Sequence, residues 1–386
     1  MSLLSLVGLL VFVKNNKNFI RFVRSIKNSL KTHDPKELIE KNRNLIEAFL
    51  ESRERFYSNY RDYIKLFCEN FEANKGVCKV FDNYDALNDS ILEIVQNDEH
   101  VLVYVDHEIR EINLVDHLIS MGKDVIPSRF EDYIVKKIGN GNFSLYNVNL
   151  FREDLDYSNI FSNAKAELKK AFNEVRVGIT SADALSADTG SVIITDNDGG
   201  KIRTSASPRV HIIVAGVEKI YPTFLDAWLA VYLKKIFSFY PKINYINVIT
   251  GPSRTGDIEK VLTYGAHGPN EIYAFLVDDG RLRDISYGNT MIYNCLECTL
   301  CQNMLLGMSL ISSNFDRFVE HLKEFYLAIK RNKKAILPTL LKALKLSVKN
   351  FICPISLSLN NIEPRPDIDE TLLDYITQIL KILEGI

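Results

Sequence analysis

Cysteines at regular spacing form the most chemically specific pattern in this sequence. Cys295, Cys298 and Cys301 are each separated by two residues, and Cys353-Pro354 follows later in the chain. Bacterial-type iron–sulfur proteins use three thiolates at this spacing, together with a cysteine that precedes proline. Because thiolates are the usual ligands of such clusters, the pattern predicts one [4Fe–4S] cluster bound by Cys295, Cys298, Cys301 and Cys353.

The rest of a two-cluster pattern is missing from the chain. In two-cluster ferredoxins, the fourth cysteine of each run binds the cluster of the other run. If the same spacing is continued from Cys301 and counted back from Cys353, a second cluster would need ligands at four further positions. Those positions hold Leu305, Ala343, Leu346 and Lys349. The loss of one complete ligand set and the retention of the other favour a single cluster on a fold that once carried two.

A structural zinc site with the same four cysteines is the alternative, although such sites usually consist of two C-x2-C pairs. The other two cysteines, Cys68 and Cys78, lack a spacing typical of metal ligands, and we expect them to be ordinary core or surface thiols. Six cysteines in 386 residues do not make a disulfide scaffold. A cluster motif points instead to a reducing compartment, so we expect a cytoplasmic protein.

Two further stretches carry residues that could bind or convert a small anionic substrate. In the sharp turn Asp188-Thr189-Gly190, the carboxylate of Asp188 is placed to protrude and to act as a catalytic base or nucleophile. A glycine-rich loop follows the expected strand 245–250, and such loops can bind a carboxylate or phosphate through backbone amides and an arginine. The predicted substrate-binding residues are Thr189, Gly190, Ser253, Arg254, Thr255, Gly256 and His267.

Plainer interpretations apply to the same residues. Arg254 could be a solvated arginine in an ordinary βα loop, since this loop lacks the Lys-Ser/Thr of a P-loop and the third glycine of a dinucleotide fingerprint. His267 stands close to glycines, which favours an exposed imidazole. His211 lies at the edge of an apolar run, where a core role is as consistent with its position as a functional one.

The elements that must position these residues follow from the hydrophobic periodicity. A helical pattern runs from Asp34-Pro35 to about Glu72, and strands alternate with helices between residues 79 and 126. Such alternation is typical of a parallel sheet with helical crossovers. Further expected elements are strands at about 177, 191–195, 212–215, 245–250 and 271–277, a short helix from Ser181, a hairpin at 196–200 and a helix at 159–173. Beyond residue 284 the period is helical.

Length and composition suit a soluble protein of more than one domain. The 386 residues are 46% hydrophobic and 25% charged, which allows a sizeable core, and a net charge of −2 gives no footprint for binding nucleic acid. The apolar run Ser2–Val13 is too short to cross a bilayer, so no stable membrane span is expected. We predict an N-terminal helical segment (1–75), an α/β domain (76–290) and a helical iron–sulfur domain (291–386).

Several motifs taken together resemble the LUD (lactate utilisation) domain family. They are Val177-Gly-Ile-Thr-Ser-Ala-Asp183, Ala187-Asp188-Thr-Gly190, Pro208-Arg-Val-His211, Gly216-Val-Glu-Lys219, Gly251-Pro-Ser-Arg-Thr-Gly256 and His267-Gly-Pro269. The cysteine triplet and Cys353-Pro354 are similar to those of the iron–sulfur subunit of that family's lactate-oxidising complex. The resemblance implies an α/β LUD domain akin to the sugar-isomerase and CoA-transferase-like folds, followed by a helical ferredoxin-type domain. The chain departs from the family pattern in having Asp188 where glutamate is usual, and in keeping one set of cluster ligands.

Two classes of function follow from these observations. The resemblance implies an electron-transfer subunit of an L-lactate (2-hydroxy acid) oxidising complex, with other redox subunits as partners and a small carboxylate or phosphate as a candidate ligand. The sequence shows no flavin or nicotinamide fingerprint, so this chain would need a partner that accepts the electron pair of a hydroxy acid. The alternative is a self-contained isomerase or acyl-transferase-like enzyme that uses Asp188, or an assembly protein, with the cysteines as a structural metal site.

Overall fold

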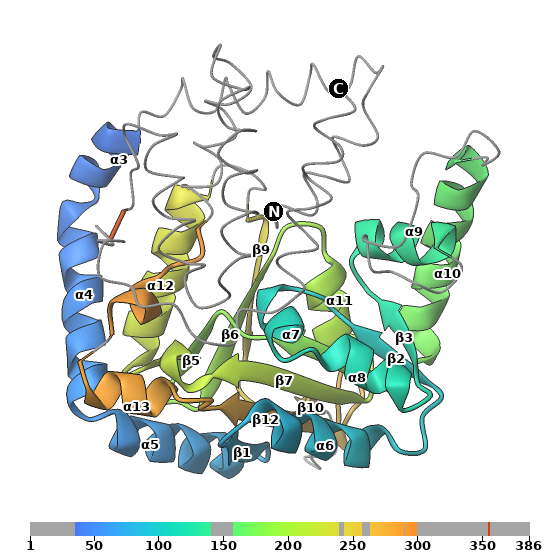
Figure 1. Ribbon diagram of the computed structural model, residues 1–386, viewed down its shortest axis with the longest axis horizontal. Helices are drawn as coiled ribbons and strands as arrows, with labels where there is room; N and C mark the ends of the chain where they lie inside the picture. Colours follow the sequence, from blue (N-terminus) through green and yellow to red (C-terminus); the bar gives the residue numbers. More distant parts are fainter. Residues whose placement is uncertain are drawn as a thin grey trace, which may run out of the picture.

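The computed structural model describes residues 35–139, 157–238, 243–256, 263–288, 290–298 and 354–355. A six-stranded sheet, a four-stranded sheet, a two-stranded sheet and the helices around them make up this part of the chain (Figure 1). The larger sheet has six parallel strands in the order β1-β12-β7-β4-β2-β3. Its strands are β1 (Val77–Phe81), β2 (His100–Val103), β3 (Asp124–Pro127), β4 (Val177–Ser181), β7 (Val210–Gly216) and β12 (Glu271–Val277).

Both faces of this sheet are covered, which explains why its central strands are continuous apolar runs. In β7, Ile212 and Val214 enter one core, whereas Ile213 and Ala215 enter the core on the opposite face, because successive side chains of a strand alternate. The first core includes side chains of α6, α7 and α8, and the second includes those of α5. The bounds of these helices are Tyr60–Ala73 (α5), Tyr84–Val95 (α6), His107–Glu111 (α7) and Leu114–Ser120 (α8).

A smaller sheet of four strands shares the second core. Its order is β8-β5-β6-β9, and β6 is antiparallel to both β5 and β9. Val192 and Ile194 of β6 face the larger sheet, whereas Ile193 faces a third core that α4 and α12 complete. These elements are β5 (Ala184–Ser186), β6 (Ser191–Asp196), β8 (Ile220–Tyr221), β9 (Tyr245–Ile249), α4 (Arg43–Ser58) and α12 (Phe224–Phe237).

Helix α4 is held to the smaller sheet by a buried arginine. Arg53 is fully buried, and its guanidinium donates to the carbonyl oxygens of Glu218 at 2.7 Å and Ile220 at 2.9 Å. The same group lies 4.7 Å from the ring centroids of Tyr57 and Tyr221, so aromatic faces complete its environment. These contacts join the N-terminal helices to the α/β domain.

The remaining elements surround this framework. Figure 1 shows α4 and α12 at one side of the molecule and α9 and α10 at the other. Their bounds are α3 (Pro35–Lys41), α9 (Phe130–Ile138), α10 (Tyr157–Glu174), α11 (Gly200–Ala206), α13 (Arg281–Ser286), β10 (Arg254–Thr255), β11 (Thr263–Tyr264) and the 3-10 turns Val217–Lys219 and Met291–Asn294.

Most of the expected elements are present, but two local predictions are wrong. Residues 184–186 form strand β5 rather than part of a helix from Ser181, because the chain passes directly from β4 into the smaller sheet. Residues 196–200 connect β6 to α11 instead of forming a hairpin. Gly199, with φ 84°, is the residue that precedes α11, and this left-handed conformation suits glycine.

The prediction for Cys68 and Cys78 also needs correction, because the structure joins them in a disulfide. Cys68 lies on α5 and Cys78 on β1, and their Cα atoms are 5.2 Å apart. These two elements are consecutive, so the short connection between them brings the two side chains together. The sequence spacing gave no indication of this pairing.

The predicted iron–sulfur domain (291–386) is described only at residues 291–298 and 354–355, so its helical ferredoxin-type fold stays a prediction. The apolar run Ser2–Val13 lies outside the described residues as well. Within the described ranges, none of the helices combines the length and the apolar character that a membrane span needs.

Candidate functional site

The turn that carries Asp188 packs against helix α5. Asn70 donates from its side-chain amide to the carbonyl oxygens of Ala187 and Asp188, and Asn74 donates to that of Thr189. The Asp188 side chain is exposed, and its carboxylate accepts a hydrogen bond of 2.5 Å from the Ser186 hydroxyl. The expected protrusion of the carboxylate is therefore present, while the backbone of the turn has a packing role.

The second predicted substrate loop folds back on the segment that carries His267. Strand β10 (Arg254–Thr255) pairs with β11, and the Ser253 amide donates to the Pro269 carbonyl at 2.7 Å. Arg254 and His267 are both exposed. Residue 270, which follows this loop, pairs with Arg209 at the amino ends of β12 and β7. The loop consequently lies at the amino-end edge of the larger sheet.

The two predicted substrate stretches meet beside the end of α5. Thr189 donates to the Ser191 hydroxyl, which is 3.2 Å from the Thr250 hydroxyl. Gly251 approaches the Asn74 carbonyl so closely that a Cβ there would be 2.4 Å from the oxygen. The structure thus brings these stretches together, although the glycine-rich loop does not follow a strand of the parallel sheet. Strand β9 belongs to the smaller sheet and is antiparallel to β6.

Residues 295–298, which we call the cysteine loop, pack against helices α4 and α12. Cys298 is buried, Cys295 is exposed, and Glu297 between them has a left-handed backbone with φ 51°. The Glu297 amide donates to Cys295 Sγ at 3.5 Å, and the Ser238 hydroxyl donates to the Cys298 carbonyl at 3.0 Å. The other two predicted ligands, Cys301 and Cys353, lie outside the described residues.

The described residues next to Cys353 share a core with the cysteine loop. Ile355 is 6% exposed and belongs to the same hydrophobic cluster as Leu296 and Cys298, together with side chains of α4 and α12. Figure 1 shows the short red segment 354–355 beside α4. The chain therefore returns to the region of the cysteine loop immediately after Cys353.

A topological switch point lies between β2 and β4 of the larger sheet. From β2 the chain continues to β3 at the sheet edge, whereas from β4 it next joins this sheet at β7, on the other side. In open α/β sheets, ligands usually bind beyond the carboxyl ends of the strands at such a point. Asp106 follows β2, Ser181 ends β4 and Asp183 follows it, so polar residues gather at this switch point.

Lys201 of α11 reaches these polar residues at the switch point. Its Nζ donates to Ser181 Oγ at 2.8 Å and lies 3.0 Å from Asp106 Oδ2 and 3.4 Å from Asp183 Oδ2. The Ser181 hydroxyl donates in turn to Asp106. The side chains of Lys201 and Asp183 are each only 5% exposed, so water can contribute little to their solvation. The ion pairs between these side chains take the place of hydration by water.

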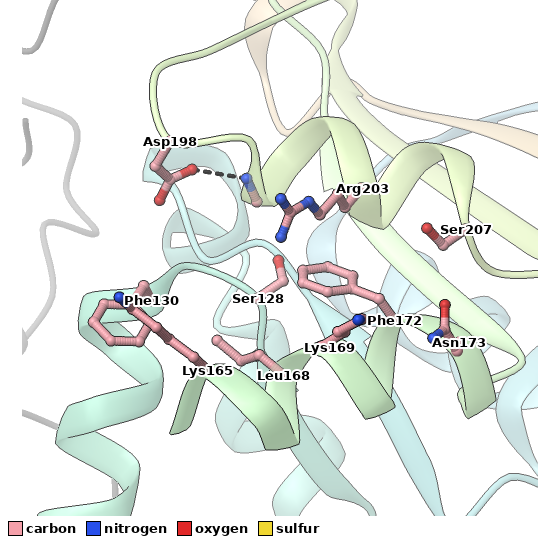
Figure 2. A pocket seen from close by; sticks show the side chains of 11 residues that line it. Ser128, Phe130, Lys165, Leu168, Lys169, Phe172, Asn173, Asp198, Arg203 and Ser207 are labelled. Atoms are coloured by element: carbon pink, nitrogen blue, oxygen red, sulfur yellow. Dashed lines mark hydrogen bonds between the residues drawn. The ribbon is translucent and has the colours of Figure 1, made fainter. Parts of the chain in front are cut away.

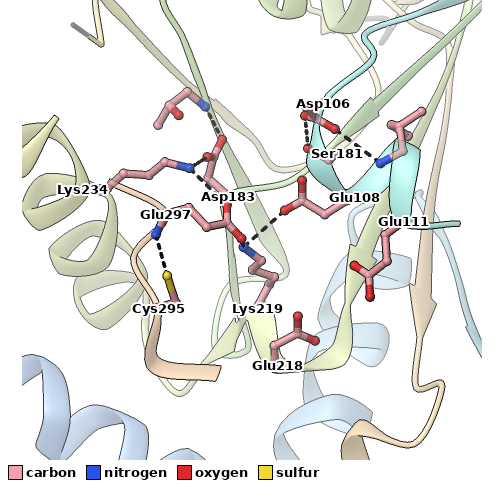
Figure 3. A network of polar contacts seen from close by, with 12 residues as sticks. Asp106, Glu108, Glu111, Ser181, Asp183, Glu218, Lys219, Lys234, Cys295 and Glu297 are labelled. Atoms are coloured by element: carbon pink, nitrogen blue, oxygen red, sulfur yellow. Dashed lines mark hydrogen bonds and ion pairs between the residues drawn. The ribbon is translucent and has the colours of Figure 1, made fainter. Parts of the chain in front are cut away.

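Two further lysines connect the switch point to the cysteine loop (Figure 3). Lys234 Nζ is 2.5 Å from Asp183 Oδ1 and 3.4 Å from Glu297 Oε2. Lys219 Nζ is 3.2 Å from Glu108 Oε1 and also pairs with Glu297. The residue between the two described cysteines is therefore ion-paired with both lysines. We call Asp106, Glu108, Asp183, Lys201, Lys219, Lys234 and Glu297 the buried charge network.

The network stabilises the ionised forms of most of its members. Burial opposes ionisation of Asp183, but the charges of Lys201 and Lys234 outweigh it and hold the pKa of this carboxyl well below its usual range. Burial likewise opposes the charge of Lys201, yet Asp183 and Asp106 raise its pKa above the ordinary lysine value. Glu108 differs, since burial and the nearby Glu297 raise its pKa. Burial thus favours the protonated form of Glu108.

The sequence prediction did not include this network. Asp183 and Lys219 do occur within the motifs that resemble a known family, but no spacing rule assigns them a role. A usable signal was present, because charged residues that directly follow buried strands gather at the carboxyl edge of a sheet. The partners of these residues come from α7, α11 and α12, and their proximity depends on the crossovers.

His211 is a core residue in this structure. It is fully buried in β7, where Nε2 lies 2.9 Å from the Thr180 hydroxyl. Burial lowers the pKa of His211 to about 3, so the imidazole is neutral at physiological pH. Among the described residues, no group of three His, Cys, Asp or Glu side chains is arranged to hold a metal ion. The described residues include only two of the four predicted cluster ligands, Cys295 and Cys298.

Comparison with known proteins identifies the family. The model of the LUD domain matches residues 64–277, which is more than half of the chain. The chain belongs to the LUD domain family. The matched residues include the whole parallel sheet and all of the buried charge network except Glu297.

Curated relatives of this LUD protein carry the name lactate utilization protein B. The protein of Bacillus subtilis is 26% identical over 275 residues, which cover 66% of this chain and 56% of that protein. The protein of Shouchella clausii is 30% identical over 142 residues, which cover 36% and 28%. The chain spans about half the length of the curated relatives it matches. A solved DUF162 family protein from Deinococcus radiodurans is 14% identical with a TM-score of 0.35, covering 56% of this chain and 97% of that one.

Proposed function

We propose that this chain is the iron–sulfur electron-transfer subunit of a complex that oxidises L-lactate or a similar 2-hydroxy acid. One [4Fe–4S] cluster would be held by Cys295, Cys298, Cys301 and Cys353. The observation that carries the proposal is the four-cysteine pattern in a relative of proteins named for lactate utilization. A bound cluster supplies one-electron transfer.

The surroundings of the two described cysteines suit thiolate ligands. The Glu297 amide points at Cys295 Sγ, and such N–H donors stabilise thiolates and raise the reduction potential of a bound cluster. Cys298 lies in an apolar core with Leu296 and Ile355, which limits access of water. Ile355, two residues after the fourth predicted ligand in the sequence, packs in the same core as Leu296 and Cys298.

The buried charge network would hold the cysteine loop in position. Glu297 is clamped by Lys219 and Lys234, and those lysines also pair with Glu108 and Asp183 at the switch point. The loop geometry is thereby tied to the LUD domain. Oxidation of a hydroxy acid releases two electrons, so a partner subunit would accept the pair and pass single electrons to this chain.

The visible spectrum of anaerobically purified protein tests the cluster. We expect a broad absorption band in the blue that dithionite bleaches, because sulfur-to-iron charge transfer gives iron–sulfur proteins their colour. Cys353→Ser should lose the band and most of the iron, whereas Cys68→Ser should keep both. A colourless native protein that contains zinc, or a Cys353→Ser variant with its full iron content, would contradict the proposal.

A second experiment separates electron transfer from a merely structural cluster. The native protein is purified together with its bound partners, and L-lactate is added under anaerobic conditions. The visible band should bleach in the complex but not in the isolated chain, since the chain needs a partner as electron-pair acceptor. If neither lactate nor another 2-hydroxy acid bleaches the band in the complex, a structural role of the cluster would be favoured.

A further inference from the structure

A pocket of about 620 Å³ lies between helices α10 and α11, outside the buried charge network. Its volume falls within the range of small-molecule sites, roughly 300–1,000 Å³. Figure 2 shows its walls. Its lining includes Ser128, Lys165, Lys169, Phe172, Asp198 and Arg203.

Positive charge dominates this α10–α11 pocket. Lys165 and Lys169 lie one helical turn apart on α10, and Arg203 lies on α11 across the pocket. Asp198 is the acidic group of the lining, and its carboxylate accepts from the Gly200 amide at 2.8 Å. Burial and the neighbouring Asp196 raise the pKa of Asp198 to about 7, so near neutral pH it carries only part of a negative charge. An anion is therefore the favoured kind of ligand.

A buried hydroxyl is directed into the same space. Ser128 is 2% exposed, and its Oγ has no hydrogen-bond partner among the described residues. Figure 2 shows this hydroxyl pointing into the pocket from below, with the Arg203 guanidinium above it. A buried hydroxyl without a partner is costly, by about 1–3 kcal/mol, unless a ligand or water satisfies it. A ligand oxygen placed between Ser128 and Arg203 would do so.

One wall of the pocket is apolar. Leu168 and Phe172 are both 5% exposed and form one side together with Phe130. The Arg203 guanidinium lies 5.6 Å from the centroid of the Phe172 ring, which keeps the cationic group beside an aromatic face. A ligand with an apolar or aromatic part could pack on this wall while its anionic group meets the cations.

We propose that the α10–α11 pocket binds a small organic anion, namely a phosphate or carboxylate joined to an apolar or aromatic group. Arg203 and Ser128 hold the oxyanion, Lys165 and Lys169 add attraction at the rim, and the Phe172 wall takes the apolar part. The proposal does not depend on a cluster. It concerns the opposite side of α11, because Lys201 of the same helix faces the buried charge network.

Calorimetric titration with four simple probes tests the proposal. Phenyl phosphate and benzoate combine an oxyanion with a ring, whereas inorganic phosphate and benzyl alcohol each supply one half. Phenyl phosphate or benzoate should bind more tightly than inorganic phosphate and benzyl alcohol do. Whichever of phenyl phosphate and benzoate binds more tightly indicates whether the pocket prefers a phosphate or a carboxylate. Equal binding of phenyl phosphate and inorganic phosphate, with no binding of benzoate, would overturn the organic part. No binding of any probe at millimolar concentration would overturn the site.

Variants then locate the bound probe. Arg203→Gln should weaken binding about tenfold or more, and Ser128→Ala should weaken it severalfold, because each removes one partner of the oxyanion. Lys170→Gln is the matched control, since Lys170 is on α10 but does not line the pocket and pairs with Glu174. If Lys170→Gln weakens probe binding as much as Arg203→Gln does, the probe binds a nonspecific basic surface and the proposed site is wrong. If Arg203→Gln fails to fold, Lys169→Gln serves in its place.

Discussion

Asp183 pairs with two lysines of the buried charge network. Its two carboxylate oxygens face Lys234 and Lys201, and Oδ2 also accepts from the Thr195 amide at 2.6 Å. Removal of one member of a buried ion pair leaves the partner charged without compensation, which typically costs about 3–5 kcal/mol. At this position two buried lysines would lose a partner at once.

Asp183→Asn should therefore lower the free energy of unfolding by about 3–5 kcal/mol, measured by urea titration at pH 7. The control is Lys65→Gln, which removes an exposed pair with Glu69 and should change stability by about 0.5 kcal/mol or less. If the two variants lose similar free energy, the network does not contribute through its buried charges.

The pH dependence of the same variant follows from the lowered pKa of Asp183. A carboxyl with a lower pKa in the folded state binds fewer protons than it does in the unfolded chain. Its stabilisation is present above the unfolded pKa of about 3.9 and is lost as the pH falls toward the folded value. The difference in unfolding free energy between native protein and Asp183→Asn should thus be constant from pH 7 to about 5 and shrink below pH 4. A difference that grows in acid would contradict this assignment.

Among the elements, helix α5 holds the turn Asp188-Thr189-Gly190 in place. Gly190 has φ 62°, and an added Cβ would lie 2.4 Å from the Phe71 amide nitrogen and 2.5 Å from the Asn70 carbonyl carbon. A side chain at this position would force helix and turn apart. The turn that carries Asp188 therefore depends on a close approach of two backbones.

Gly190→Ala and Gly122→Ala form a matched pair for this contact. Gly122 also has a positive φ, 80°, but a Cβ there meets nothing within 4 Å. Gly122→Ala should cost only the backbone strain of about 1–2 kcal/mol. Gly190→Ala should cost about 1–3 kcal/mol more through overpacking, measured by urea unfolding. Equal losses in the two variants would show that α5 and the turn are not in contact.

At the scale of the whole molecule, one core joins segments that are far apart in the chain. Ile46 of α4, Ala227 of α12, Leu296 beside Cys295 and Ile355 all belong to it. Such a core packs the cysteine loop and Ile355 together. It also packs residues 296 and 298 of the loop against side chains of the LUD domain.

Ile355→Ala should lower the free energy of unfolding by about 2–5 kcal/mol, the usual cost of a cavity left by a buried isoleucine. Ile119 on α8 is 45% exposed, and Ile119→Ala should cost far less. Urea unfolding of the metal-free protein provides the comparison. If both variants lose the same small amount, Ile355 does not occupy the core, and the support for Cys353 near the triplet disappears.

The sequence by itself determined the α/β class, most strands and helices, the resemblance to the LUD family and the candidate cluster cysteines. The elements follow from local periodicity, the cysteine prediction from spacing, and the resemblance from short sequence motifs, all of which can be read along the chain. The tertiary structure alone decided that β9 joins the smaller sheet and that Cys68 meets Cys78. It also decided that Lys219 and Lys234 reach both the switch point and the cysteine loop. Crossover connections set those contacts by bringing distant residues to one sheet edge, and no local pattern encodes which strands become neighbours.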